Sequence, residues 1–157
     1  MATASPAAEP KRRPVAVLFV CGMNKVRSPM AAALAHQLFP TGLYVASAGV
    51  RKGGEPDAFV ATVMEEAGVD LTRHRPRTIE DLEDTHFDVV ITLSPEAHHR
   101  ALELTRTMAL DVEYWPTPDP TIATGGREQI LDAYRAVRDG LRERIKERFG
   151  WTPLPSG

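Results

Sequence analysis

The sequence has few residues of several kinds, and each shortage excludes a class of protein. Cys21 is its one cysteine, which excludes a disulfide within the chain, a CxxC redox pair and a cysteine-rich zinc site. Lysine and arginine total 19 against 21 acidic residues, whereas nucleic-acid and membrane-surface binders usually carry a large basic excess. We therefore expect neither nucleic acid nor membrane as a partner, and any basic site must be local.

Long hydrophobic runs are also absent. The longest covers residues 15–23, and a bilayer-spanning helix needs about 20 apolar residues. Basic residues at 11–13 give the run some likeness to a secretion signal. Against a signal, the apolar run is short and is followed closely by Lys25 and Arg27. A buried strand leading into a site explains this segment better. We expect a cytoplasmic location, where a reactive thiol stays reduced.

The remaining composition is that of one globular domain. The chain has 157 residues, 43% of them hydrophobic, and a formal charge of -2. Residues 1–14 are rich in alanine and proline and predict a flexible leader. The domain is expected over residues 15–150, followed by a C-terminal tail at 151–157.

Apolar runs alternate with helical periodicity along this domain. The predicted strands are residues 15–20, 43–48, 87–93 and 112–115. The predicted helices are a first one capped by Ser28 and stopped at Pro40, then 57–67, a short one at 78–83, 95–107 and 127–149. This alternation predicts a three-layer α/β fold, a four-stranded parallel sheet flanked by helices. Ligands of such sheets bind beyond the carboxyl ends of the strands, which selects the loops after Val20, Ala48 and Trp115.

The segment after the first strand carries the chemistry. Residues 21–28 read Cys-Gly-Met-Asn-Lys-Val-Arg-Ser, with an arginine six positions after the cysteine. The intervening residues can curl so that their N–H groups surround a tetrahedral oxyanion at a helix N-terminus. These loop residues are Gly22, Met23, Asn24, Lys25 and Val26.

Cys21, Arg27 and Ser28 have distinct expected roles. Arg27 can bind two anion oxygens and, with the helix N-terminus, favours a thiolate at Cys21. That thiolate can attack phosphorus to form a phosphocysteine, and Ser28 can donate a hydrogen bond to it as it leaves. The alternative is that Cys21 is a small buried apolar residue. A chance match of cysteine to this arginine and hydroxyl spacing has a probability of about 1%, which favours the catalytic interpretation.

A general acid is needed to protonate the leaving oxygen, and Asp119 is the candidate. It follows the fourth strand, between Pro118 and Pro120, on the expected edge of the sheet. Asp88 and Asp111 precede their strands and are expected at the opposite edge. The alternative for Asp119 is an ordinary Asp-Pro turn.

Together these segments resemble the low molecular weight protein tyrosine phosphatases and the related thioredoxin-type arsenate reductases. The resemblance covers nearly the whole chain after the leader. It rests on the C-x5-R-S loop, Ser47-Ala48-Gly49, Gly68-Val69-Asp70, residues 74–77 and Asp119-Pro120. It implies a low molecular weight phosphatase-like fold, with Cys21 as nucleophile, Arg27 as phosphate clamp, Ser28 as thiolate partner and Asp119 as acid and then base. It also implies a hydrogen-bond network of Asn24, Ser28, Ser47 and His74. The alternative is that Ser47 and His74 only satisfy local backbone groups.

Three departures from the family pattern concern the substrate. Val26 stands where the tyrosine phosphatases usually have a second cysteine. Thr121 stands where they usually place an aromatic residue, and residues 51–54 lack the aromatic that often forms the other wall of a phosphotyrosine slot. Tyr114 or Trp115 could substitute, although packing is the simpler role for both. A basic rim suited to acidic or multiply phosphorylated substrates is a further possibility, formed by Arg51, Lys52, Arg73, Arg75 and Arg77. The alternative is that these residues only form a solvated face.

Three functions are consistent with this sequence. The first is a phosphatase that hydrolyses phosphomonoesters, foremost protein phosphotyrosine, through a phosphocysteine. The second is an arsenate reductase, which with one cysteine would need an external small thiol. The third is a non-catalytic module that binds phosphate or another oxyanion. We expect no cofactor and no metal, since the five histidines show no ligand spacing, and His98 and His99 are predicted at the surface.

Overall fold

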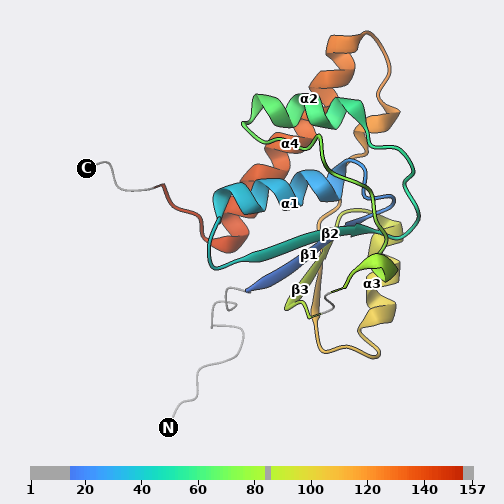
Figure 1. Cartoon of the computed structure of the whole chain (residues 1–157), viewed down its shortest axis with the longest axis vertical. Helices are drawn as coiled ribbons and strands as arrows, with labels where there is room; N and C mark the ends of the chain where they lie inside the picture. The colour runs from blue at the N-terminus through green and yellow to red at the C-terminus, as the bar shows by residue number, and fades with distance from the viewer. Residues whose placement is uncertain (1–14, 84–85, 154–157) are drawn as a thin grey trace.

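One parallel sheet organises the computed structural model, which describes residues 15–83 and 86–153 (Figure 1). The expected leader at 1–14 lies outside the described residues. The strand order is β2-β1-β3-β4, and every neighbouring pair is parallel. The strands are β1 (Ala16–Cys21), β2 (Tyr44–Gly49), β3 (Val89–Thr92) and β4 (Asp111–Tyr114). The predicted three-layer α/β fold is confirmed.

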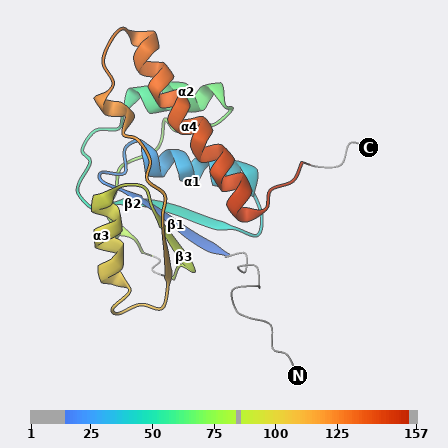
Figure 2. The same ribbon diagram turned by 180° about the vertical axis from the view of Figure 1, so that it is seen from behind.

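Helices cover both faces of the sheet. They are α1 (Arg27–Leu38), α2 (Ala58–Glu66), α3 (Pro95–Leu104) and α4 (Arg127–Phe149), with short 3-10 turns η2 (Ile79–Asp81) and η3 (Pro120–Ile122). Figures 1 and 2 show α1, α2 and α4 on one face, and α3 with the short turn η2 on the other. Of the helices in the described part of the chain, none is long and apolar enough to span a membrane.

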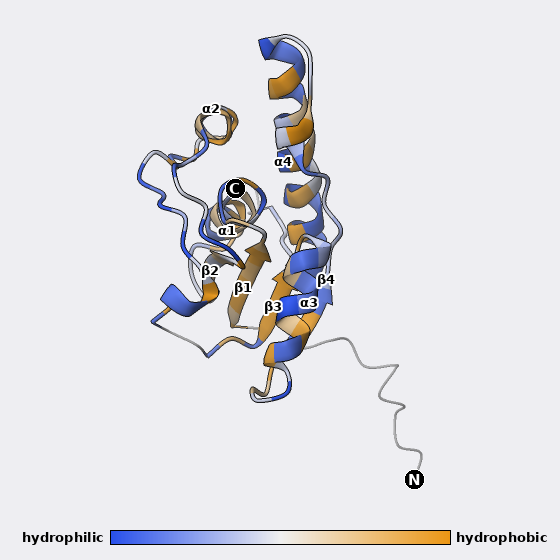
Figure 3. Cartoon of the chain, turned by 90° about the vertical axis from the view of Figure 1, so that its right-hand side faces the viewer, coloured by the Kyte–Doolittle hydropathy of each residue, from blue (hydrophilic) through white to orange (hydrophobic). Residues whose placement is uncertain are grey.

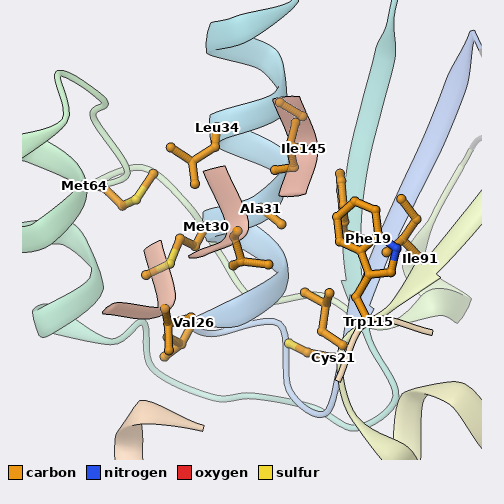
Figure 4. Packing of buried hydrophobic residues seen from close by; sticks show 14 of the residues in the cluster. Phe19, Cys21, Val26, Met30, Ala31, Leu34, Met64, Ile91, Trp115 and Ile145 are labelled. Atoms are coloured by element: carbon orange, nitrogen blue, oxygen red, sulfur yellow. The ribbon is translucent and has the colours of Figure 1, made fainter. Parts of the chain in front are cut away.

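Two apolar clusters fill the spaces between the layers. Side chains alternate across β1, so Val17 and Phe19 face α1 and α4 while Leu18 and Val20 face α3. Because both faces are covered, this strand is apolar at nearly every position, as the strands in Figure 3 show. Figure 4 shows Phe19 and Trp115 beside Ile145 of α4, with Cys21 and Val26 at the base of α1. The core thus reaches the carboxyl edge of the sheet and supports the loop that begins there.

The start of α1 differs from the prediction. Ser28 was expected to cap this helix, but α1 begins at Arg27, and Val26 occupies the cap position without a side-chain cap. The Ser28 side chain is fully buried and hydrogen-bonds to Cys21 and the Ala48 carbonyl instead. The reason is that the preceding loop folds back over the first helical turn, so the hydroxyl is used inside the loop.

Candidate active site

The loop of residues 22–26 starts where β1 ends and leads into α1. Cys21 is the last residue of β1 and is 2% exposed. The Gly22 carbonyl accepts hydrogen bonds from the N–H groups of Val50 and Arg51, which follow β2. Gly49 lies so close to the loop that a Cβ there would stand 2.7 Å from the Met23 carbonyl carbon. The carboxyl ends of β1 and β2 therefore hold the loop together.

Asn24 is the centre of a buried hydrogen-bond network. Its side-chain amide donates to Ser28 Oγ at 2.8 Å and to Ser47 Oγ at 2.9 Å. Its Oδ1 accepts from the Arg77 backbone N–H at 3.1 Å. The residue is fully buried and adopts a left-handed φ of 57°, a conformation that asparagine tolerates better than most residues. The turn and the side chain together fix the curvature of the loop.

His74 and Arg77 support this network from outside the loop. His74 Nε2 lies 2.8 Å from the Asn24 carbonyl oxygen, so this nitrogen carries the proton that is donated. Partial burial lowers the pKa of His74 below its ordinary value, outweighing the opposite effect of the bond to Asn24. The charges of Arg77 and Arg75 lower this pKa further. The neutral imidazole is thus the form that fits this position.

Ser28 lies within reach of the sulfur. Its Oγ is 2.9 Å from Cys21 Sγ and 3.3 Å from the Ala48 carbonyl oxygen. With a thiol at Cys21, the S–H group can donate to Ser28 while the hydroxyl donates to Ala48. With a thiolate, the hydroxyl proton can turn to the sulfur instead. One hydroxyl can therefore serve both protonation states of Cys21.

Arg27 and Asp119 meet across the mouth of the loop. Arg27 Nη2 is 4.0 Å from Asp119 Oδ2, and Arg27 Nη1 donates to the Thr117 carbonyl at 3.0 Å. The other Asp119 oxygen accepts from the Thr121 N–H at 2.9 Å and from its hydroxyl at 2.6 Å. Asp119 is thus oriented from one side, with its free oxygen toward Arg27. Asp88, by contrast, lies at the amino edge and binds the N–H groups at the start of β1.

The sequence that folds into this arrangement matches the model of one protein family. The low molecular weight phosphotyrosine protein phosphatase family matches residues 16–149. The chain belongs to this family. Its named relatives are enzymes with two different activities, so the family alone leaves the reaction open between them.

Three relatives illustrate this division within the low molecular weight phosphatase family. An arsenate reductase of Bacillus licheniformis is 33% identical over 87% of this chain and 95% of its own length. A protein-arginine-phosphatase of Geobacillus stearothermophilus is 31% identical over 87% of this chain and 97% of its own. A solved structure of an arsenate reductase in its oxidized state has a TM-score of 0.71 and 26% identity, over 87% of this chain and 97% of that one.

The structure places Val26, one of the departures from the phosphatase pattern, and the two aromatic residues that could substitute in a phosphotyrosine slot. Val26 is 5% exposed and belongs to the main core cluster. Trp115 is buried against Phe19, with ring centroids 6.0 Å apart, so packing is its role. Tyr114 is 36% exposed and stacks on His98 at 4.6 Å. Both rings therefore have packing partners of their own.

His98 is a correction to the surface placement predicted for both adjacent histidines. His99 is exposed, but His98 is partly buried between Tyr114 and the Thr92 hydroxyl, 3.0 Å from its Nδ1. Because Thr92 also donates to the Glu113 carbonyl, Nδ1 of His98 carries the donated proton. Within residues 15–83 and 86–153, no group of three His, Cys, Asp or Glu side chains could hold a metal ion.

Several contacts at the site have no signal in the sequence. They include the bond from the Arg77 backbone to Asn24 and an ion pair between Arg51 and Glu96. These two contacts join residues 53 and 45 positions apart in separate elements. The hydrogen bond from Thr121 to Asp119 is different. Thr121 lies two positions after Asp119, so the spacing is compatible with an Asx-type turn, which the sequence can indicate.

Proposed function

We propose that this protein is a cysteine-dependent phosphatase that hydrolyses phosphomonoesters, with protein phosphotyrosine as the first substrate to test. The observation that carries the proposal is the 2.9 Å contact between Cys21 Sγ and Ser28 Oγ, next in the chain to Arg27, whose guanidinium lies 4.0 Å from Asp119. A buried sulfur with a dedicated hydroxyl partner, next to a helix N-terminus, is suited to leave and attack as a thiolate.

The first chemical step transfers the phosphoryl group to sulfur. The Cys21 thiolate attacks phosphorus, the S–P bond forms, and the P–O bond to the leaving group breaks. Asp119 gives its proton to the departing oxygen, while Arg27 and the loop N–H groups stabilise the charge on the phosphoryl oxygens.

The second step releases phosphate. A water molecule attacks phosphorus and gives its proton to the Asp119 carboxylate, and the S–P bond breaks. The Ser28 hydroxyl turns from the Ala48 carbonyl to the sulfur and stabilises the departing thiolate. Both steps return the enzyme to its starting state without a cofactor. A cytoplasmic setting, in which thiols stay reduced, suits this nucleophile.

The experiment is hydrolysis of p-nitrophenyl phosphate from mildly acidic to neutral pH by the wild type and three variants. Cys21→Ser should abolish turnover, and Asp119→Asn should lower kcat by about 10²- to 10⁴-fold, the usual contribution of a general acid. Asp139→Asn, which changes an exposed aspartate on α4, is the matched control and should leave kcat unchanged. Full activity in Cys21→Ser would overturn the proposal.

Arsenate reduction is the second candidate, because relatives at 30% and 33% identity are named arsenate reductases. Arsenate has the charge and nearly the shape of phosphate. Since Cys21 is the single cysteine, a small external thiol would have to attack a Cys21–arsenate adduct. Arsenate-dependent oxidation of glutathione by a protein that does not hydrolyse p-nitrophenyl phosphate would favour this candidate. Phosphate binding by Cys21→Ser, with no turnover of either substrate by the wild type, would favour a binding module.

A further inference from the structure

An ion pair crosses the rim of the site directly beside the nucleophile loop. Arg51 Nε donates to Glu96 Oε2 at 2.7 Å, and Arg51 Nη2 donates to Glu96 Oε1 at 3.1 Å. Arg51 belongs to the segment after β2, and Glu96 lies in the first turn of α3. A Cβ built on Gly22, the residue after Cys21, would stand 2.9 Å from Glu96 and 3.4 Å from Arg51. The pair therefore borders the entrance to the anion loop.

The backbone holds Arg51 at this position as well. The N–H groups of Val50 and Arg51 both donate to the Gly22 carbonyl at 2.9 Å. The two-point bond to Glu96 then restrains the guanidinium, so little side-chain entropy remains to be lost when it binds a ligand. The hydrogen bond to Glu96 is the main cause that raises the pKa of Arg51, so the guanidinium stays charged.

The restrained guanidinium keeps hydrogen-bond donors for a ligand. Glu96 engages Nε and one N–H of Nη2, and within the described residues no protein acceptor is seen for Nη1. The Arg51 side chain is 57% exposed. Lys25 lies near the same segment, because a Cβ on Gly53 would stand 2.9 Å from Lys25 Cγ. Lys25 thus adds a second basic side chain near the segment that carries Arg51.

Two other members of the predicted basic rim have different uses. Arg77 Nε donates to the Ser47 carbonyl at 3.0 Å, and Arg75 Nη1 donates to the His74 carbonyl at 3.0 Å. Both guanidinium groups support the chain around the Asn24 network. Arg51, in the segment that lacks an aromatic residue, is therefore the better candidate for contact with a substrate.

We propose that Arg51, braced by Glu96, is a specificity-determining residue that binds a second anionic group on the substrate. The substrate class is then a phosphorylated peptide with acidic residues beside the phosphorylated one. The substrate part of this inference rests on the proposed phosphatase function, although the binding that it predicts does not require turnover.

The test measures binding to the Cys21→Ser protein, which cannot turn over substrate. The probes are two phosphotyrosine peptides of one length, one flanked by glutamate and the other by glutamine. We expect the acidic peptide to bind about fivefold more tightly, and Arg51→Gln in the same background to remove this preference. The neutral peptide should bind both proteins equally. The preference should also shrink as salt is raised.

Arg106→Gln is the matched control, since it removes one exposed positive charge beyond the far end of α3. It should keep the full preference. An equal preference in Arg51→Gln and the Cys21→Ser parent, or no binding of either peptide, would overturn the inference. Failure of the proposed function would appear separately, as wild-type protein that does not hydrolyse p-nitrophenyl phosphate.

Discussion

Asn24 in the loop after β1 donates a 2.9 Å hydrogen bond to Ser47 in β2, 23 residues further along the chain. The same amide nitrogen also donates to Ser28. This single side chain therefore joins the loop, the neighbouring strand and the first turn of α1. The position of Cys21 between these elements depends on it.

Asn24→Ala should damage both stability and activity. It removes two buried hydrogen bonds and one partly buried one and leaves an unfavourable left-handed backbone, so we expect a loss of about 3 kcal/mol in the free energy of unfolding. Asn24→Gly loses the same bonds but tolerates the backbone, and should be more stable than Asn24→Ala by about 1 kcal/mol. Urea unfolding and p-nitrophenyl phosphate turnover measure the two effects. If the two variants are equally stable, the left-handed backbone at residue 24 does not destabilise the alanine variant, which contradicts the prediction.

Gly49→Ala should disturb the loop through the backbone. The new Cβ would lie 2.7 Å from the Met23 carbonyl carbon and 2.8 Å from the Asn24 nitrogen, so the loop must shift. We expect a loss of about 1–3 kcal/mol in stability together with a fall in kcat. Gly140→Ala is the control, because a Cβ there meets nothing within 4 Å inside α4. That change should stabilise the protein by about 1 kcal/mol and leave kcat unchanged.

The stability of the protein should depend on pH through His74. Its pKa in the folded state lies below its value in the unfolded chain, so the folded state binds fewer protons. The contribution of neutral His74 is complete above about pH 6.5 and is lost as the pH falls through the folded-state pKa. His74→Gln can still donate to the Asn24 carbonyl but does not titrate. Urea unfolding between about pH 7.5 and pH 5.5 should therefore show a smaller loss in the variant than in the wild type. An equal loss would rule out this role of His74.

Oxidation by peroxide should be hard to reverse. Cys21 is the single cysteine, so no internal disulfide can protect the sulfur, and Val26 stands where the resemblance to the tyrosine phosphatases implies a second cysteine. Peroxide-treated wild type should recover little activity with dithiothreitol and should carry sulfinic or sulfonic acid at Cys21. Val26→Cys supplies the missing thiol at a buried position of similar volume and should recover most of its activity. Mass spectrometry of the Cys21 peptide separates the two products, and complete recovery of the wild type would contradict the prediction.

Much of the fold could be predicted because the information is local. The β-branched run of β1 and the apolar stripe of α4 each repeat within one element, and Arg127–Phe149 agrees with the predicted helix at both ends. The placement of Asp119 on the same edge as Cys21 followed from the parallel sheet alone. Strand ends shifted by one or two residues, since strand ends depend on pairing with neighbours, which one segment does not encode.

The remaining features depend on long-range contacts. Arg51 and Glu96 carry no pattern that links them, because their pairing arises only when β2 and β3 lie on either side of β1. Ser28 was assigned as a cap because serine before a helix usually has that role. In the folded loop the Ser28 hydroxyl contacts Cys21 instead. The rules of helix capping do not predict that contact.

The site is built from chain segments that leave the ribosome at very different times. Cys21 and the loop after it are synthesised early, whereas Thr117 and Asp119 come from the last third of the chain. The part of α4 that buries the core beneath the loop, with Leu141 and Ile145, follows later still. During synthesis the proposed nucleophile therefore exists without its proposed acid and without the helix that covers the core beneath the loop. A growing chain should be inactive and open to oxidation until its final helix has docked, so the reducing capacity of the cell bears on how much active protein each round of translation yields.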